Sequence, residues 1–396
     1  MKKVMILGAG LLQSYVIKRA KDLGYETIVL DMDENAIGRK YADKFIPINI
    51  VDKEECLEVA QENNIDGVLT AATDYGVITS AYIANKMGLP GLDVSVAAII
   101  KNKYDVRRIL YENGADDTNQ FFEITDINDV DEVCKEAIFP LIVKPCDGSG
   151  SKGVCKVNSK DELKLAIKDA LEVSLSKKAL AETFIVGNEY GVESFVHNNE
   201  IHILGIMKKE MTKPPFYAEL GHCIPSKLPN NIEKKVKEVA EKAIKSLGIN
   251  FGAVNMDLLI TSDGKVCIVD IGARMGGNLI GSHIIPLSSG IDYMGNIIKC
   301  AVGDNPDFQR KYDKPIATRL LALTPGEIIE VPDFSKYNCM DNLEVVCKLK
   351  EGDVINKYKN NLDGCGYVVA KGDGIDECIK MAEKAKNDID REIKRK

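Results

Sequence analysis

Two aspartates on either side of a predicted β-hairpin are the residues of this sequence best placed to do chemistry. The segment VNMDLLITSDGKVCIVDIGARMGGN carries Asp257 and Asp270, and Asp263-Gly264 between them is a pair preferred in two-residue hairpin turns. If the chain turns at that pair, Asp257 lies directly opposite Asp270, with their Cβ atoms about 5 Å apart. The flanking residues of both strands are apolar, so we expect this sheet to be covered on both faces.

Facing carboxylates in a covered sheet favour a bound cation. The two charges repel each other and are costly to bury unless a cation lies between them. Oxygen ligands close to a phosphate are typical of Mg²⁺ or Mn²⁺. The hairpin therefore predicts a metal site at Asp257 and Asp270. Two alternatives stay open from the residues alone: both acids lie at a solvated rim, or Arg274 alone neutralises them.

A loop of small residues follows a strand that ends in a lysine. In LIVKPCDGSGSKGV the strand ends at Lys144, and the loop contains Gly148, Ser149, Gly150, Ser151, Lys152 and Gly153. Glycines let backbone N–H groups turn toward an anion, and the two lysines add positive charge. The loop lacks the G-K-[ST] ending of a P-loop. Taken alone it is equally consistent with a flexible hairpin tip, but beside the acid pair we interpret it as a phosphate cover.

Two other segments carry charged residues that are uninformative by themselves. LAETFIVGNEYGVESFV contains a strand with Glu182, then Phe184 and Ile185, and then Glu189 before a second strand. From the residues alone this is an ordinary hairpin with exposed acids. Lys103, in the run KNK, is equally consistent with the solvated face of a helix.

The elements that must position these residues fall into three regions. In residues 1–115, short apolar strands alternate with amphipathic helices, the last of them a basic helix over residues 99–114, which predicts βαβ units and a parallel sheet. Residues 116–305 read as antiparallel strand pairs, interrupted by one long helix over residues 231–248. Residues 306–396 hold short strands and a charged helix from about Gly374. The predicted class is α/β and α+β: a parallel N-terminal domain, a middle domain of two α+β subdomains and a small mixed C-terminal domain.

The first strand leads into a glycine loop, GAGLLQ. Its place between a strand and a helix, and the acid Asp31 at the end of the next strand, fit a dinucleotide-binding fingerprint. The third glycine of that fingerprint is missing, because Gln13 stands there. A structural turn, or a ligand other than a dinucleotide, is therefore favoured over a nicotinamide site, and a nicotinamide-dependent oxidoreductase is the least favoured function.

Composition narrows the classes of function. The 396 residues are 45% hydrophobic and carry a net charge of −8, without a long basic block, which argues against a nucleic-acid or membrane-surface partner. The eleven cysteines lack C-x-x-C spacing and are expected to be reduced thiols. The N-terminal apolar run is too short for a signal sequence, and no stretch is long enough to span a membrane. We expect a soluble, cytoplasmic protein.

Taken in order, these segments resemble the ATP-grasp superfamily of carboxylate–amine ligases and related enzymes. The order is a lysine (Lys103), the strand-Lys144-Pro145 with its glycine and serine loop, E-x-F-I-x-G-x-E, and the acid–hairpin–acid followed by Arg274 and a glycine pair. The resemblance covers nearly the whole chain. It implies that the N-terminal region is the α/β domain that precedes the ATP-grasp module.

The resemblance also implies roles for individual residues. Lys103 and Lys144 would contact ATP, and residues 147–153 would form a lid over its β- and γ-phosphates, with Lys144 and Lys152 acting in catalysis. Glu182 with the backbone at Phe184 and Ile185 would hold the adenine, and Glu189 the ribose. Asp257 and Asp270 would be the ligands of Mg²⁺ or Mn²⁺. The substrate side would comprise Arg274, also catalytic, with Gly276, Gly277, Asn278 and, as one option, His283, which alternatively satisfies local hydrogen bonds.

The implied reaction passes the γ-phosphoryl group of ATP to a carboxylate, and an amine then attacks the acyl phosphate to give an amide, ADP and phosphate. The substrates would be small molecules, and a homodimer is expected by analogy. Two positions depart from the family pattern: the second metal acid is Asp270 where Glu is usual, and Gly272 stands where many members have a third ligand, Asn. The run D-I-G-A-R resembles the amino-acid ligase branch. Alternatives are a purine-type or carbamoyl-phosphate-type enzyme that uses bicarbonate or a nucleotide precursor, and a nucleotide-binding regulatory protein without turnover.

Overall fold

The computed structural model describes residues 1–118, 120–148, 152–214 and 216–396. Its N-terminal region contains a parallel sheet in the order β3-β2-β1-β4. Its strands are β1 (Lys3–Leu7), β2 (Glu26–Leu30), β3 (Lys44–Ile46) and β4 (Gly67–Thr70). The helices and turns that follow are α1 (Leu11–Asp22), η1 (Ile37–Tyr41), α2 (Lys53–Asn63) and α3 (Val77–Met87). The predicted βαβ pattern is confirmed.

The basic helix predicted over residues 99–114 is broken into two helices. They are α4 (Val94–Lys101) and α5 (Lys103–Glu112), separated at Asn102. Asn102 is extended, and its side chain accepts a hydrogen bond from the backbone N–H of Tyr104, which caps α5. The backbone N–H of Lys103 donates to the carbonyl of Cys146 at 2.8 Å. The break therefore places Lys103 at the start of a helix, against the strand that leads into the glycine loop.

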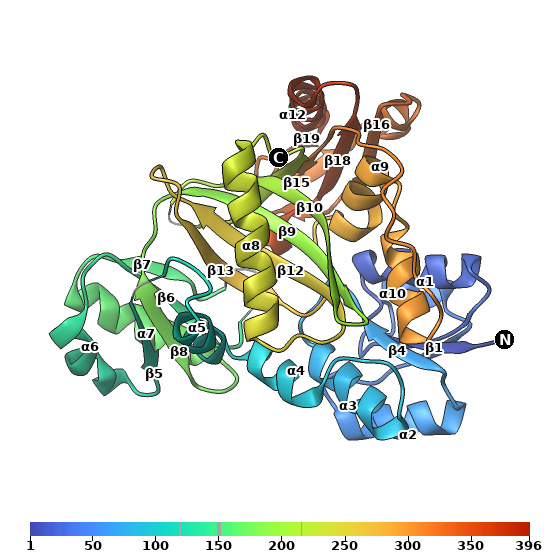
Figure 1. Cartoon of the computed structure of the whole chain (residues 1–396). Coiled ribbons are helices and arrows are strands. Elements are labelled where there is room, and N and C mark those ends of the chain that lie inside the picture. The colour runs from blue at the N-terminus through green and yellow to red at the C-terminus, as the bar shows by residue number, and fades with distance from the viewer. Residues whose placement is uncertain (119, 149–151, 215) are drawn as a thin grey trace.

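A small antiparallel sheet carries the glycine and serine loop of residues 147–153. Its order is β5-β8-β6-β7, with β5 (Phe121–Ile124), β8 (Ala179–Thr183), β6 (Leu141–Pro145) and β7 (Cys155–Val157). The turn η2 (Ile127–Asp129) and the helices α6 (Val130–Glu136) and α7 (Lys160–Val173) complete this lobe, which Figure 1 shows as the green part at the left.

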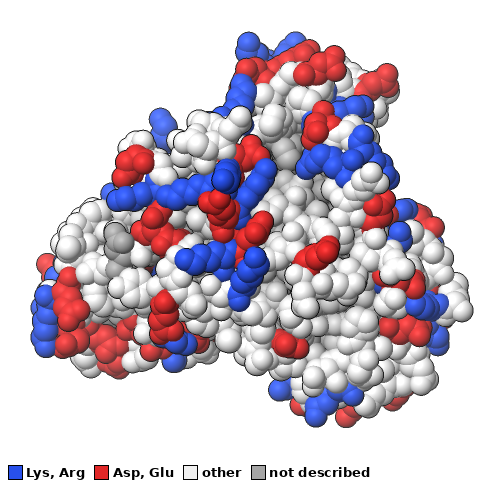
Figure 2. All heavy atoms as spheres, viewed as in Figure 1, with Lys and Arg blue, Asp and Glu red and all other residues white. Residues whose placement is uncertain are grey.

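The centre of the molecule is a large antiparallel sheet in the order β13-β12-β9-β10-β11-β14-β18-β16. The strands from the middle of the chain are β9 (Asn188–His197), β10 (Glu200–Met211), β11 (Glu219–Ile224), β12 (Gly252–Ile260) and β13 (Val266–Gly272). Helix α8 (Asn230–Ser246) crosses the face of β9, β12 and β13 (Figure 1). Its apolar stripe covers the sheet, and charges of both signs are interspersed over its outer side (Figure 2).

The last third of the chain extends the same sheet. Strands β14 (Ile316–Leu320), β16 (Leu343–Cys347) and β18 (Gly366–Lys371) pair beyond β11, and α12 (Ile375–Glu392) packs on them. The remaining elements are β15 (Gly326–Glu330), β17 (Val354–Ile355), β19 (Lys394–Arg395), α11 (Ser335–Asn338) and η4 (Asn361–Asp363). The predicted boundary at residue 306 thus separates strands of one sheet, and the charged C-terminal helix is confirmed.

The hairpin that carries the two acids has the predicted pairing but not the predicted turn. Near the turn Ile260 pairs with Val266 and the backbone N–H of Thr261 donates to the carbonyl of Lys265, so three residues, 262–264, form the loop, with Gly264 at φ +79°, where a left-handed residue is needed. A β-bulge at Val269 then inserts one extra residue in β13, and Asp257 pairs with Asp270. The longer loop shifts the pairing by one residue and the bulge shifts it back, so the acids face each other as predicted. The predicted two-residue turn is wrong.

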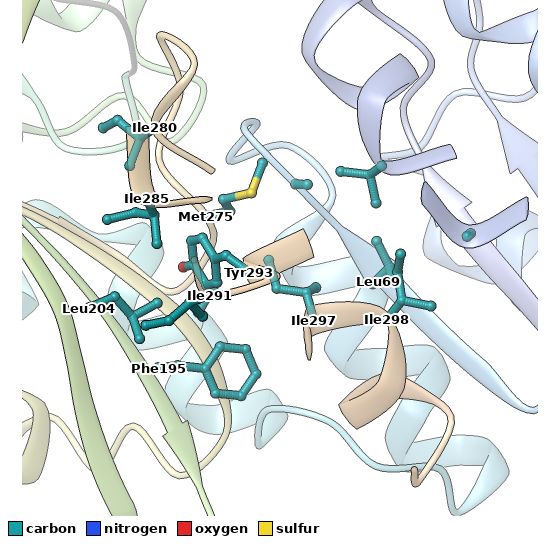
Figure 3. Close-up of a cluster of buried hydrophobic side chains, with 14 of the residues drawn as sticks. Leu69, Phe195, Leu204, Met275, Ile280, Ile285, Ile291, Tyr293, Ile297 and Ile298 are labelled. Atoms are coloured by element: carbon teal, nitrogen blue, oxygen red, sulfur yellow. The ribbon is translucent and has the colours of Figure 1, made fainter. Parts of the chain in front are cut away.

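A hydrophobic core joins the N-terminal sheet to the large sheet. Between them lies the segment that contains the turn η3 (Ile280–Ile284) and the helices α9 (Ile285–Ser289) and α10 (Tyr293–Ala301). Figure 3 shows Met275, Tyr293 and Ile298 of this segment between Leu69 of β4 and Phe195 of β9. All five side chains are buried. The chain that follows the second acid is therefore clamped between two layers.

The loop after β1, residues 8–13, is held by hydrogen bonds to neighbouring segments. Gln13 donates through Nε2 to the carbonyl of Ala71 at 2.5 Å, and the carboxylate of Asp31 accepts from the backbone N–H of Ala9 at 2.7 Å. The glutamine that replaces the third glycine thus ties the loop to the segment after β4. Asp31 accepts a hydrogen bond from the loop itself, so its carboxylate takes part in holding the turn.

Candidate active site

Two cavities adjoin on one side of the large sheet. The larger measures about 780 Å³ and lies between the small antiparallel sheet and the strands β9, β10, β12 and β13. The smaller, about 40 Å³, lies between the large sheet and the N-terminal region. Both are lined by Lys103, Gly148, Asp257 and Asp270. The predicted acid pair therefore stands at the junction of a space large enough for a nucleotide and a second, smaller space.

Each of the two acids has a lysine partner. Lys209 Nζ lies 2.9 Å from Asp257 Oδ1, and Lys103 Nζ lies 2.8 Å from Asp270 Oδ1. Arg274 pairs instead with Asp74, with 2.9 Å between Nε and Oδ1. The alternative that Arg274 alone neutralises the two acids is therefore wrong.

Lys209 is the centre of a buried cluster of acids. Besides Asp257, its Nζ contacts Glu189 at 2.9 Å and Glu219 at 2.5 Å, and its side chain is almost fully buried. Burial raises the pKa of Asp257 to about 7; Lys209 opposes this, and the charges of Glu219 and Glu189 add to it. Three carboxylates around one ammonium leave an excess of negative charge. The cluster therefore places more carboxylates than ammonium groups in the wall of the larger cavity.

The lysine at the end of β6 belongs to a second buried network. Lys144 Nζ lies 2.6 Å from Glu182 and donates to the carbonyl of Val269, the bulge residue, at 2.8 Å. The other oxygen of Glu182 accepts from Arg107 at 2.7 Å, and Arg107 also pairs with Asp116 at 2.8 Å. Burial tends to raise the pKa of Glu182, but Arg107 and Lys144 together hold it below its usual value. Its carboxylate therefore holds Lys144 in place at the cavity wall.

The glycine loop forms one edge of the larger cavity. Gly148 and Lys152 line it, while Ser149, Gly150 and Ser151 lie outside the described residues. The start of the loop is anchored because the carboxylate of Asp147 accepts from the backbone N–H groups of Leu175 and Ser176 at 3.2 and 2.7 Å. Gly153, at the other end, has φ +74°.

The predicted adenine and ribose residues line the same cavity. Phe184, Ile185 and Glu189 are among its walls. Phe184 packs against Tyr217, and Lys156 Nζ lies 4.4 Å from the centroid of its ring. The backbone N–H of Phe184 is already bonded to the carbonyl of Pro140 at 3.0 Å.

The smaller cavity is closed by segments far apart in sequence. Arg274 and Asp74, 200 positions apart, pair across it. Burial tends to lower the pKa of Arg274, and Asp74 raises it above its usual value, so the guanidinium is charged. Gly276 donates its backbone N–H to Glu193 at 2.9 Å, and the same carboxylate oxygen accepts from Tyr293 at 2.6 Å. The predicted substrate segment is therefore pinned by a carboxylate from β9.

The remaining predicted substrate residues lie beside this segment. A Cβ atom on Gly277 would lie 3.8 Å from Leu12 of the N-terminal region. Asn278 donates to Glu219, and its own oxygen accepts from Tyr367 at 3.2 Å. His283 lies in η3, hydrogen-bonded to Ser282 at 2.7 Å and 3.3 Å from Glu344. Its partners point it toward the C-terminal region.

Sequence reasoning missed several charged residues of the site. Lys209, Glu219, Glu193 and Asp74 were not identified. Lys209 gave no signal, because the run Met207–Glu210 holds three consecutive charged residues and their alternating burial appears only in the fold. Asp74 gave no signal, because its partner lies in another region of the chain.

The side chains at the acid pair fit a magnesium–nucleotide complex. Across the described parts of the chain, no three His, Cys, Asp or Glu side chains are arranged to hold a metal ion by themselves. Mg²⁺ is usually held by one or two carboxylates together with phosphate oxygens and waters. Asp257 and Asp270, facing each other at the edge of the larger cavity, match that requirement.

Other predictions from composition can also be compared with the structure. All eleven cysteines are free thiols, as expected. In the ranges that the structure covers, no helix has both the length and the apolar character needed to cross a membrane.

Comparison with known proteins agrees with this geometry. The ATP-grasp domain model matches residues 137–282, the ATP-grasp N-terminal domain model matches 17–91, and the L-amino acid ligase C-terminal domain 2 model matches 319–394. The chain is 26% identical over 398 residues to formate-dependent phosphoribosylglycinamide formyltransferase from Methanocaldococcus jannaschii, covering 96% of this chain and 95% of the relative.

Two solved structures share the whole fold. Phosphoribosylglycinamide synthetase from Anaerococcus prevotii is 25% identical, with a TM-score of 0.79, and the match covers 100% of this chain and 99% of that one. L-amino acid ligase from Bacillus licheniformis is 22% identical, with a TM-score of 0.85 and coverage of 99% and 98%. The predicted fold class is confirmed. The predicted cofactors, ATP and Mg²⁺, agree with the ATP-grasp domain match and with the MgADP bound in the solved biotin carboxylase domain of the Hydrogenobacter thermophilus 2-oxoglutarate carboxylase. The chain belongs to the ATP-grasp superfamily of ATP-dependent ligases.

Proposed function

We propose that this enzyme is a carboxylate–amine ligase that forms an amide through an acyl phosphate and releases ADP and phosphate. The observation that carries the proposal is the position of Asp257 and Asp270 between a cavity of nucleotide size and a small cavity lined by Arg274. Phosphoryl transfer needs alignment, charge neutralisation and exclusion of water, and a junction of this kind supplies all three.

The roles of the side chains follow from their positions. ATP would occupy the larger cavity, between Phe184 and Ile185 on one side and Lys144 on the other, with Glu189 at the ribose. Lys103, Lys152 and the glycine loop would neutralise its phosphates. Asp257 and Asp270 would hold Mg²⁺, which would supply positive charge against the charge that develops on the phosphates during transfer. Arg274 would hold the substrate carboxylate in the smaller cavity; Gly276, Gly277 and Asn278 follow it in the chain and are not among the residues that line either cavity.

We propose an amino acid as one substrate. This rests on the match of residues 319–394 to an L-amino acid ligase domain. A purine-type enzyme is the second candidate. It is favoured because a relative whose match to this chain covers 95% of the relative's length is a formate-dependent phosphoribosylglycinamide formyltransferase. We also propose the division 1–115, 116–305 and 306–396, since each family match falls within one of these ranges. A cytoplasmic homodimer remains a proposal by analogy with the superfamily.

An assay for ADP and phosphate release tests the function. The enzyme is incubated with ATP and Mg²⁺ and with pools of amino acids, other small carboxylates and amines. We expect release that needs both a carboxylate and an amine, with an amide as product. Release with formate or bicarbonate and a phosphoribosyl amine, and none with amino acids, would favour the purine-type candidate. ATP binding without ADP formation in any pool would contradict the ligase.

A further inference from the structure

The acid pair and the next residue pair along the same two strands form a group of four positions on one face of the large sheet. Asp257 pairs with Asp270, and two residues along the same strands Asn255 pairs with Gly272. Residues two apart in a strand point to the same side, and directly opposed residues share a face. All four line the smaller cavity. This group of four positions therefore carries oxygen-bearing side chains at three corners and bare backbone at the fourth.

The amide of Asn255 is held in one orientation. Its Nδ2 donates to Oε2 of Glu193 at 2.9 Å, and Glu193, its neighbour on β9, is fully buried. The guanidinium of Arg274, on the other side of the amide, can only donate, so the amide oxygen must face Arg274 and the nitrogen must face Glu193. The other end, Oδ1, lies 3.4 Å from Nη1 of Arg274, a residue of the cavity wall. The oxygen of Asn255 is thus the end that is turned toward the cavity.

The space beside Gly272 borders the ion pair between Asp74 and Arg274. A Cβ atom at Gly272 would lie 3.4 Å from Asp74 Oδ1 and 3.5 Å from Arg274 Cζ. A longer side chain on that strand would compete with the ion pair between Asp74 and Arg274. Asn255, on β12, already stands beside this ion pair: its nitrogen is bound by Glu193 and its oxygen lies 3.4 Å from Nη1 of Arg274.

We propose that Asn255 is the third protein ligand of the Mg²⁺ that accompanies the nucleotide, through Oδ1 and beside Asp257 and Asp270. The inference rests on the proposed function. It places the amide ligand on β12, whereas the resemblance to the superfamily places such a ligand on β13, at the position of Gly272. Mg²⁺ accepts neutral amide oxygens as well as carboxylates, and an amide completes the oxygen set without adding negative charge to an acid-rich cluster. Glu193 is a positioning residue, since it orients this amide and also binds the backbone N–H of Gly276.

The test measures metal binding directly and uses Mn²⁺ in place of Mg²⁺. Calorimetry gives the dissociation constant of ADP with and without Mn²⁺ for the whole chain, and electron paramagnetic resonance reports the environment of the bound Mn²⁺. Asn255→Ala is expected to reduce the gain in ADP affinity that Mn²⁺ provides by about tenfold or more, and to change the Mn²⁺ spectrum. Asn255→Asp, which keeps an oxygen at that place, is expected to retain the gain within about threefold.

Asn63→Ala is the matched control. Asn63 is also half-buried, donates through Nδ2 to a protein oxygen and accepts from a cation, Lys44, but it lies at the end of α2, outside both cavities. It should leave ADP and Mn²⁺ binding unchanged. If Asn255→Ala proves poorly folded, Asn255→Ser, which keeps a hydroxyl for Glu193, is the second variant. It is expected to lose the same gain in ADP affinity that Mn²⁺ provides.

Unchanged Mn²⁺ binding in Asn255→Ala, together with its loss in Asp270→Asn, would overturn the inference and leave the proposed function standing. If the unmodified enzyme bound ADP no more tightly with Mn²⁺ than without it, both would be overturned.

Discussion

The two cavities are built in different ways. The larger is lined mostly by residues 142–189 and 208–219, which belong to neighbouring strands and to the loops between them. The smaller exists because the N-terminal region packs on the large sheet, with an ion pair between residues 200 positions apart. Changes in the larger cavity are therefore expected to alter nucleotide binding and stability, and changes in the smaller one to alter turnover. The acid pair, which belongs to both, should affect both.

The largest effect is expected at the junction, from Asp270→Asn. Removing a charge that holds the metal and its phosphates should lower turnover by about 1,000-fold, the upper range for loss of one group that stabilises developing charge. The fold should persist, because Asp270 lies at the cavity and its partner Lys103 has a second carboxylate, Asp74, nearby. Steady-state ADP release and circular dichroism measure the two properties. Turnover within tenfold of the unmodified enzyme would contradict the metal role.

Next in size is the effect of Lys209→Met on the nucleotide side. Loss of the buried ammonium leaves Glu189, Glu219 and Asp257 without their shared partner. Breaking a buried pair in this way should lower the free energy of unfolding by about 3–5 kcal/mol. Urea denaturation measures it. Lys208→Met, one residue earlier and exposed, is the control and should change the free energy of unfolding by less than about 0.5 kcal/mol.

Arg274→Ala separates the two cavities most directly. Since Arg274 lines the smaller cavity and not the larger one, turnover should fall by about 100-fold while the dissociation constant of ADP stays within about threefold. Steady-state kinetics and calorimetry on the same preparation give the two values. An equal loss in both would mean that the cavities do not act separately, and an unchanged rate would remove Arg274 from the site.

The smallest effect is expected at the end of the glycine loop. Gly153 has φ +74°, and a Cβ atom there would lie 3.0 Å from Pro145 Cγ. Gly153→Ala should therefore cost about 1–2 kcal/mol of stability, the usual penalty for a left-handed residue with a side chain. Thermal denaturation measures the change. Gly374→Ala, at φ −130° with nothing within 4 Å, is the control and should be neutral or slightly stabilising. Equal effects of the two would contradict the strain.

The course of the hairpin and of the basic helix shows where prediction succeeded and where it failed. The facing of Asp257 and Asp270 was predicted, yet the turn was not, because a bulge at Val269 compensates for a longer loop. Apolar patterning defines which residues belong to a strand, but a bulge depends on what its carbonyl meets, here Lys144. The helix over residues 99–114 breaks at Asn102 for a similar reason: capping and a bond to Cys146 override helical periodicity.

By itself, the sequence determined the strands, the long helices, the order of the motifs and the facing acids. These depend on local periodicity and on turn residues, which act over a few positions. The tertiary structure decided which cation meets which acid. Lys209, Asp74 and Glu193 reach the site from strands and loops far from it in the chain, and their partners are chosen by burial, since a charge removed from water must be paired wherever the fold brings one close.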